Sequence, residues 1–158
     1  MPAMNRDWNV RAAGVGDLDV LVRFNCDMAL ETERKKLDAE RVRAGVRRLI
    51  EEPELGRVLV VTDPAGNAVG AMAVTTEWSD WRNGRFWWIQ SVYILPEFRR
   101  QGVFSALYRQ IEVEARAAED VCGLRLYVER ENETAQATYL HLGMEETHYR
   151  LFEVDFHA

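Results

Sequence analysis

The sequence contains few cysteines, few lysines and no long apolar run. Cys26 and Cys122 are its only cysteines; their separation matches no zinc-binding motif, and two cysteines make no disulfide framework. No stretch of about 18 consecutive apolar residues occurs, and the first residues lack the apolar core of a signal peptide. We therefore expect a cytoplasmic protein with free thiols and no membrane partner.

Positive charge is also scarce. The chain has 20 basic and 26 acidic residues, a net charge of -6, and only two lysines, Lys35 and Lys36. A nucleic-acid backbone favours a basic partner, so we expect no nucleic-acid partner, although a local basic patch is compatible with this charge. Uniform use of arginine is typical of a GC-rich genome, and arginine also suits bidentate contacts with phosphate or carboxylate groups.

The sequence lacks two common nucleotide-binding motifs, and its histidines and cysteines show no spacing typical of metal ligands. The chain has neither the Gly-x-x-x-x-Gly-Lys run of an ATP phosphate-binding loop nor the Gly-x-Gly-x-x-Gly fingerprint of dinucleotide-binding folds. The histidines His141, His148 and His157 lie near the C-terminus without catalytic or metal-ligand spacing. We expect no bound metal.

The composition supplies enough apolar material for one packed domain. Of the 158 residues, 47% are hydrophobic and 29% are charged, which is ordinary for a globular protein. We expect a single domain over residues 1–158.

Apolar periodicity and turn residues predict an alternating series of strands and helices. In chain order we expect a strand at 8–13, helices at 18–30 and 38–52, strands at 57–62, 68–76 and 86–95, a helix at 103–118, a strand at 124–129, a helix at 132–142 and one or two strands within 144–156. Asp17 is placed to cap the first helix, and Gly143 to end the last one.

Residues 86–95 are almost continuously apolar, and this pattern predicts their position in the sheet. Such a run is typical of a strand buried on both faces, so we place it at the centre of the sheet. The helix and strand that follow should complete a right-handed crossover between parallel strands.

The decapeptide L-P-E-F-R-R-Q-G-V-F, residues 95–104, joins this strand to the next helix. The first turn of a helix presents N–H groups without intrahelical acceptors at the positive end of the helix dipole, and such groups bind phosphate. Gly102 permits the turn and a close backbone approach, and Arg99 or Arg100 can add a charged contact. The stretch predicts an anion site.

Two segments resemble the GNAT superfamily of acyl-CoA-dependent N-acetyltransferases. Residues 99–104, R-R-Q-G-V-F, are similar to the family's Q/R-x-x-G-x-G/A loop, and residues 132–144 are similar to its N-x-x-A-x-x-x-Y-x-x-x-G-F segment. The resemblance implies an α/β fold with a mixed, mostly antiparallel sheet flanked by helices, in the order β-α-α-β-β-β-α-β-α-β. It also implies acetyl-CoA as co-substrate.

The resemblance further implies which residues bind the coenzyme. The pyrophosphate loop would comprise Arg99, Arg100, Gln101, Gly102, Val103, Phe104 and Ser105. Backbone groups of Val92, Tyr93 and Ile94 would pair with the pantetheine arm where the strand separates from its parallel neighbour, and Asn132 would contact the coenzyme. Phe104 departs from the family's Gly or Ala, so its ring must point away from the phosphates.

The same resemblance implies a catalytic tyrosine. Tyr139 matches the residue that protonates the departing thiolate, and a phenol with a pKa of about 10 is protonated at neutral pH. Attack by an amine also calls for a base. Glu77 is our candidate, with Glu31 and Glu33 as alternatives, whereas Gln90 cannot serve.

Aromatic residues gather before and within the apolar strand. Trp81 and Trp88, with Asp80, Glu31 and Gln90, could hold a cationic amine acceptor. Core packing or a homodimer contact explains the tryptophans equally well.

The sequence therefore predicts an N-acetyltransferase that transfers an acetyl group from acetyl-CoA to a primary amine of a small molecule or peptide. Two alternatives remain: a non-catalytic acyl-CoA-binding regulatory module of the same fold, and a domain that binds a nucleotide or phosphate metabolite at the same helix start.

Overall fold

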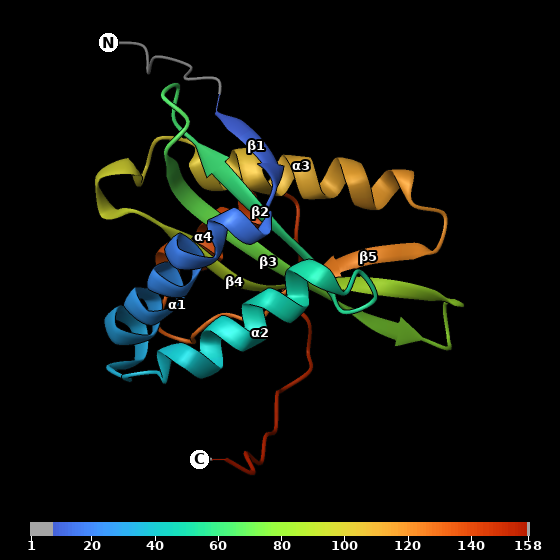
Figure 1. Ribbon diagram of the computed structural model, residues 1–158. Coiled ribbons are helices and arrows are strands. Elements are labelled where there is room, and N and C mark those ends of the chain that lie inside the picture. The colour runs from blue at the N-terminus through green and yellow to red at the C-terminus, as the bar shows by residue number, and fades with distance from the viewer. Residues whose placement is uncertain (1–7, 158) are drawn as a thin grey trace. The chain divides into compact units, whose positions relative to one another are not determined.

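The computed structural model describes residues 8–157, which belong to two compact units that meet in sequence between Leu126 and Tyr127. The first unit contains β1 (Asn9–Ala12), α1 (Leu18–Glu33), α2 (Ala39–Glu51), β2 (Gly56–Thr62), β3 (Ala68–Ser79), β4 (Gly84–Ile94), α3 (Val103–Ala117) and β5 (Val121–Arg125) (Figure 1). The second contains α4 (Glu133–His141). One domain over residues 1–158 stays a prediction.

The sheet of the first unit is mixed and mostly antiparallel. Its strand order is β1-β2-β3-β4-β5; the first three pairings are antiparallel, and β4 pairs with β5 in parallel. A parallel pair needs a crossover connection, and α3 supplies it. The predicted fold class is confirmed.

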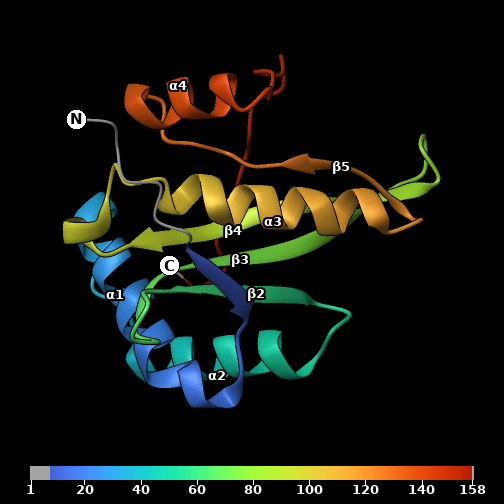
Figure 2. The same ribbon diagram turned by 90° about the horizontal axis from the view of Figure 1, so that it is seen from above.

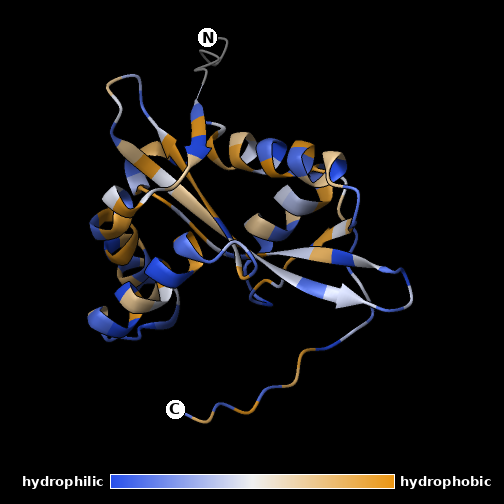
Figure 3. Ribbon diagram, turned by 45° about the vertical axis from the view of Figure 1, so that its right-hand side comes forward, coloured by the Kyte–Doolittle hydropathy of each residue, from blue (hydrophilic) through white to orange (hydrophobic). Residues whose placement is uncertain are grey.

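Helices cover both faces of this sheet. Figure 2 shows α1 and α2 on one face and α3 on the other. On the α1 and α2 side, the buried residues Leu21 and Phe24 of α1 pack against Val60, Ala71 and Tyr93 of the sheet. Figure 3 shows mainly hydrophobic strand segments between the helix layers and a mainly hydrophilic far end of the β3–β4 hairpin. None of the helices in residues 8–157 is long and apolar enough to cross a membrane.

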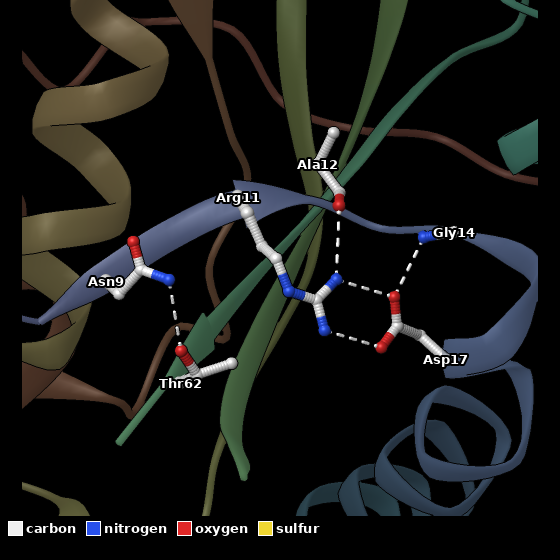
Figure 4. Close-up of polar contacts among 6 residues, drawn as sticks. All are labelled: Asn9, Arg11, Ala12, Gly14, Asp17 and Thr62. Carbon is white, nitrogen blue, oxygen red and sulfur yellow. Dashed lines mark hydrogen bonds and ion pairs between the residues drawn. The ribbon is translucent and has the colours of Figure 1, made fainter. Parts of the chain in front are cut away.

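A bidentate ion pair fixes the connection from β1 to α1. The Arg11 guanidinium donates to both carboxylate oxygens of Asp17 at 2.8 Å, and the Gly14 N–H donates to Asp17 Oδ2 at 2.8 Å (Figure 4). The hydrogen bond from Arg11 holds the pKa of Asp17 below its usual range. Asp17 does stand at the position before α1, but its carboxylate caps no amide of that helix and stabilises the preceding turn instead.

Asp38 shows the capping chemistry expected at a helix start. Its Oδ1 accepts hydrogen bonds from the N–H groups of Glu40 at 3.0 Å and Arg41 at 3.3 Å, so α2 begins directly after it.

The second unit is built around a short capped helix. Asn132 Oδ1 accepts from the Ala135 N–H at 3.1 Å, which fixes the first turn of α4. After the last turn, Gly143 adopts φ +96°, a left-handed conformation that glycine reaches without strain, and the Met144 N–H donates to Tyr139 O at 3.0 Å. Both expected helix boundaries are confirmed.

Three details of the predicted strands were wrong. The apolar strand β4 is the fourth of the five strands in the sheet, not the central one. A strand is buried on both faces wherever it has a strand on each side and helices above and below, so burial does not require the central position. β5 ends at Arg125 rather than at residue 129, since its register with β4 ends there. No strand forms between 144 and 156: Leu151, Phe152 and Val154 are exposed, and the described part of the second unit offers no strand to pair with.

We expect Asp17→Asn to lower the free energy of unfolding by about 1–2 kcal/mol at pH 7, because the charged hydrogen bonds are lost. The folded-state pKa of Asp17 is depressed, so its contribution is present above the unfolded pKa of about 4 and is lost as pH falls through the folded pKa. Denaturant unfolding should show a smaller difference between wild type and Asp17→Asn near pH 2 than at pH 7.

The control Asp19→Asn removes an exposed ion pair with Arg43 and should cost only a few tenths of a kcal/mol. Equal losses for both variants at pH 7 would contradict the expectation.

Candidate functional site

The carboxyl-terminal half of β4 has an unpaired edge. β5 pairs with β4 only from Arg85 to Trp88. From Ile89 to Ile94, β4 keeps its antiparallel partner β3 on the other side, but no described strand of the first unit pairs with the edge that faces away from β3. An extended ligand can pair with such an edge as an added strand does.

A β-bulge lies where this unpaired edge begins. Val74 of β3 is opposite Ile89, but the next residue back, Ala73, is opposite Ser91. Gln90 is therefore the extra residue, and its Nε2 donates to Thr75 Oγ1 at 3.0 Å. A bulge bends its strand and raises the local twist, which turns the second half of β4 away from the direction of β5.

Hydrogen-bond alternation determines which backbone groups face the unpaired edge. The Leu95 N–H donates to Val69 O at 2.9 Å, so Leu95 is directed toward β3. Because hydrogen-bonded and non-hydrogen-bonded pairs alternate along an antiparallel ladder, Tyr93 is also directed toward β3, whereas Val92 and Ile94 face outward. Consistent with this, Ile94 O accepts from the Arg99 side chain at 2.9 Å.

The first turn of α3 presents backbone amides that have no acceptor within the helix, and we call them the first-turn amides. Ala106 makes the first backbone bond of this helix, from its N–H to Gly102 O at 3.0 Å, so the N–H groups of Val103, Phe104 and Ser105 have no acceptor within the helix. Gly102 has φ +82°, and a Cβ built there would meet no atom within 4 Å. Arg100 also has a positive φ, of 62°. Left-handed residues in such a turn aim successive N–H groups toward one point, which suits an anion.

The turn before α3 is braced by Trp8 and by its own side chains. Trp8 Nε1 donates to Gln101 O at 2.9 Å, and its ring meets that of Phe98 edge to face with centroids 5.9 Å apart. Gln101 Nε2 donates to Glu97 O at 2.8 Å. The sequence pattern did not indicate the role of Trp8, because the contact spans 93 residues of chain.

Arg99 donates hydrogen bonds to two groups of the first unit, and one of them also accepts from Tyr93. Besides the Ile94 carbonyl, it donates from Nη2 to Glu31 Oε2 at 2.8 Å, and Tyr93 Oη donates to Glu31 Oε1 at 2.8 Å. The hydrogen bonds from Arg99 and then from Tyr93 lower the pKa of Glu31, while burial and the Glu31 carboxylate raise the pKa of Tyr93 to about 12. Arg99 thus links α1, β4 and the loop, and Arg100 is the arginine left for an anion.

Phe104 is half-buried at the start of α3. Its ring lies beside that of Tyr108, one turn further along the same helix, with centroids 6.2 Å apart. Its backbone N–H belongs to the first-turn amides. A large side chain at this loop position is therefore compatible with an anion site.

Glu77, the candidate base, is ion-paired. Its Oε1 lies 2.6 Å from Arg125 Nη1, and the Arg125 guanidinium covers the Phe86 ring at 3.6 Å. Glu77 is opposite Phe86 in the sheet, and Val92 is six residues further along β4, or about 20 Å. Because Glu77 is paired and far from the outward-facing Val92, we assign it no catalytic role.

The structure does not bring the expected acceptor residues together. Asp80 and Trp81 lie in the turn of the β3–β4 hairpin, where the Trp81 N–H donates to Asp80 Oδ1 at 3.1 Å and the Trp81 side chain is 86% exposed. Glu31 instead contacts Tyr93. Tyr93 lies nine residues along β4 from Gly84, the first residue after the hairpin turn, which is a distance of about 30 Å along the strand.

Trp88 and Gln90 do lie near each other. Trp88 is opposite Thr75 in the sheet, and Gln90 donates to the hydroxyl of that residue. They mark the point on β4 where pairing with β5 stops.

In the second unit, the two residues singled out by the sequence lie on α4. Asn132 uses its side-chain oxygen to cap the helix, which leaves its amide nitrogen for other contacts. Tyr139 lies in the last half of α4 and is half-buried, and this burial raises the pKa of its phenol.

A model of the acetyltransferase (GNAT) family matches residues 23–144. The chain belongs to this family. It is 42% identical to a possible acetyltransferase from Clostridium difficile 630, over 94% of this chain and 97% of that one, with a TM-score of 0.86. No curated protein matches the chain.

Two aminoglycoside acetyltransferases share the fold at low identity. One is the aminoglycoside N-acetyltransferase AAC(6')-Iy in complex with CoA, which is 14% identical over 96% of each chain, with a TM-score of 0.77. The other is the 6'-N-acetyltransferase AAC(6')-Ih from Acinetobacter baumannii, which is 16% identical over 94% of this chain and 97% of that one, with a TM-score of 0.75.

Acetyl-CoA, the co-substrate of GNAT acetyltransferases, fits the residues of this site. Its pyrophosphate matches the first-turn amides of α3 and the open space beside Gly102, where a side chain would otherwise stand. Its amide-containing arm matches the outward-facing backbone of Val92 and Ile94. The donor set is made of backbone groups, which explains how an acidic chain can hold an anionic ligand.

We expect Gly102→Ala to weaken coenzyme A binding about tenfold, because the added methyl group occupies the open space at the start of α3. Calorimetric titration with coenzyme A measures this without an acceptor. The matched control is Gly66→Ala in the β2–β3 turn, where φ is +90° and a Cβ also meets nothing within 4 Å. Both variants should lose about 1 kcal/mol of stability from the strained backbone, but only Gly102→Ala should lose affinity. An equal affinity for the two variants would overturn this assignment.

Proposed function

We propose that this GNAT protein transfers an acetyl group from acetyl-CoA to a primary amine by direct attack. The observation that carries the proposal is the unpaired edge of β4 that follows the bulge at Gln90, in the same unit as the first turn of α3. Together they offer an extended strand edge for the arm of the coenzyme and an anion site for its pyrophosphate.

Bound acetyl-CoA supplies an activated acyl thioester. The amides of Val103, Phe104 and Ser105 bind the pyrophosphate oxygens, and Arg100 adds a positive charge next to them. Ile94 and Val92 hold the arm along the edge of β4. In this arrangement the outward N–H of Val92 donates to the thioester oxygen, where it stabilises the negative charge that develops during attack.

Tyr139 is the proton donor in this proposal. The thiolate that leaves the acyl group is a better leaving group when a nearby acid protonates it. Burial raises the pKa of the Tyr139 phenol, so the phenol is fully protonated at neutral pH and can donate. Asn132, which begins the same helix, has an amide nitrogen left for a contact with the coenzyme.

The direct test is a thiol-release assay with acetyl-CoA across a library of amines. We expect release of coenzyme A that depends on the amine, together with an acetylated amine product. Calorimetry with coenzyme A, ATP and NAD is the companion measurement. Binding of coenzyme A without turnover on any amine would favour a non-catalytic acyl-CoA-binding module, and preference for ATP or NAD would favour a nucleotide-binding domain.

Tyr139→Phe tests the proposed proton donor. We expect kcat to fall about 100-fold while KM for acetyl-CoA changes little, because the phenyl ring keeps the packing and lacks only the hydroxyl group that carries the proton. The matched control is Tyr149→Phe, a 66% exposed tyrosine in the same unit, which should leave kcat unchanged. A wild-type rate in Tyr139→Phe would remove this residue from the mechanism.

A further inference from the structure

A pocket of about 110 Å³ lies on the sheet face that α1 and α2 cover. Apolar walls come from Leu21 of α1, Val46 and Leu49 of α2, and Val58 of β2. Two polar side chains line it as well, Asn25 and Ser91. The Asn25 amide nitrogen already donates to Leu21 O at 2.9 Å, so this side chain offers the pocket a carbonyl oxygen.

The pocket reaches the part of β4 where the unpaired edge begins. Ser91 follows the bulged Gln90 and precedes Val92, whose N–H faces the unpaired edge. α3 covers the opposite face of the sheet (Figure 2). A group bound in this pocket therefore lies against Ser91, the residue next to Val92 in β4.

The charges around the pocket are unfavourable for a polycation. None of its lining residues is a carboxylate. On α2, Arg41 stands four residues before Gly45, which lines the pocket, so helical spacing places it on the same side of the helix. Arg48, three residues after Gly45, is ion-paired with Glu52. Glu31 is paired with Arg99, and Asp27, whose charge acts on Tyr93, lies outside the lining.

We propose that this pocket holds a compact apolar group of the amine acceptor, and that the preferred acceptor carries no second positive charge. The inference rests on the proposed acetyltransferase function and specifies its substrate class. A branched alkyl group fills the apolar walls, whereas a second ammonium group would be desolvated there without a carboxylate partner. Such an acceptor differs from the polycationic aminoglycosides named for two proteins of the same fold.

Gly45→Leu tests the pocket itself. A Cβ at Gly45 meets no atom within 4 Å, so a leucine side chain can enter the pocket, and replacing a glycine inside a helix favours folding. Ala44→Leu is the matched control, because Ala44 is exposed on the same helix and does not line the pocket. We expect Gly45→Leu to raise KM for the acceptor at least tenfold with an unchanged Kd for coenzyme A. Equal acceptor KM values in the two variants would overturn the proposal.

A pair of amines of similar length tests the substrate class. We expect the wild-type protein to prefer 3-methylbutylamine over 1,4-diaminobutane by at least tenfold in kcat/KM, and Gly45→Leu to reduce this preference. Equal use of the two amines, or preference for the diamine, would overturn this inference while the acetyltransferase function stands. Absence of coenzyme A release with every amine would overturn the proposed function, and this inference with it.

Discussion

The limited pairing between β4 and β5 is the constraint on which the rest of the site depends. An interior strand normally satisfies its backbone groups on both sides, because an unpaired buried amide or carbonyl is costly. Here the parallel pairing ends at Trp88, and the bulge at Gln90 separates the strand into a paired half and a half with an unpaired edge. The sheet thus retains the stability of a packed core and keeps a row of backbone groups for a ligand.

The neighbouring loop compensates for part of this unpaired edge. Arg99 donates to the Ile94 carbonyl and is itself held by Glu31, which also accepts from Tyr93. One arginine therefore satisfies a carbonyl of β4 and ties the end of α1 to the loop before α3. Its charge is largely neutralised by Glu31, so the anion site relies on backbone amides and on Arg100. A site of this kind needs no positive net charge on the whole chain.

The acceptor side follows from the same geometry. Most of the aromatic side chains that gather in the sequence around the β3–β4 turn lie at the end of β4 that is paired with β5, and among the aromatic acceptor residues expected on β4, Trp88 alone reaches the start of the unpaired edge. The pocket beside Ser91 lies at the other half of the strand and draws its walls from α1, α2 and three strands. In the proposed mechanism the backbone binds the coenzyme, and in the proposed substrate preference side chains of α1 and α2 select the amine.

Local patterns in the sequence were sufficient for most of the fold. Apolar periodicity located α1, α2 and α3, Asp38 and Gly143 act at the helix ends as their chemistry requires, and the strand–helix–strand order predicted the parallel pair. The two segments similar to the GNAT family also indicated the loop at Gly102 and the helix that carries Tyr139. These features depend on neighbours within a few residues, so the sequence alone determines them.

Contacts between distant segments decided the rest. The pairing of β4 with β5 ends after four residues of β4, although the apolar alternation of the second strand continues to Val128. Trp8 braces a loop 93 residues away, Glu77 meets Arg125, and Glu31 meets Arg99. A sequence pattern indicates which side chains are apolar or charged. Which hydrogen-bond or ion-pair partner each one meets is determined only when strands and helices pack together. For that reason the tertiary structure, and not the sequence, gave Glu31 a structural partner and separated the expected acceptor residues.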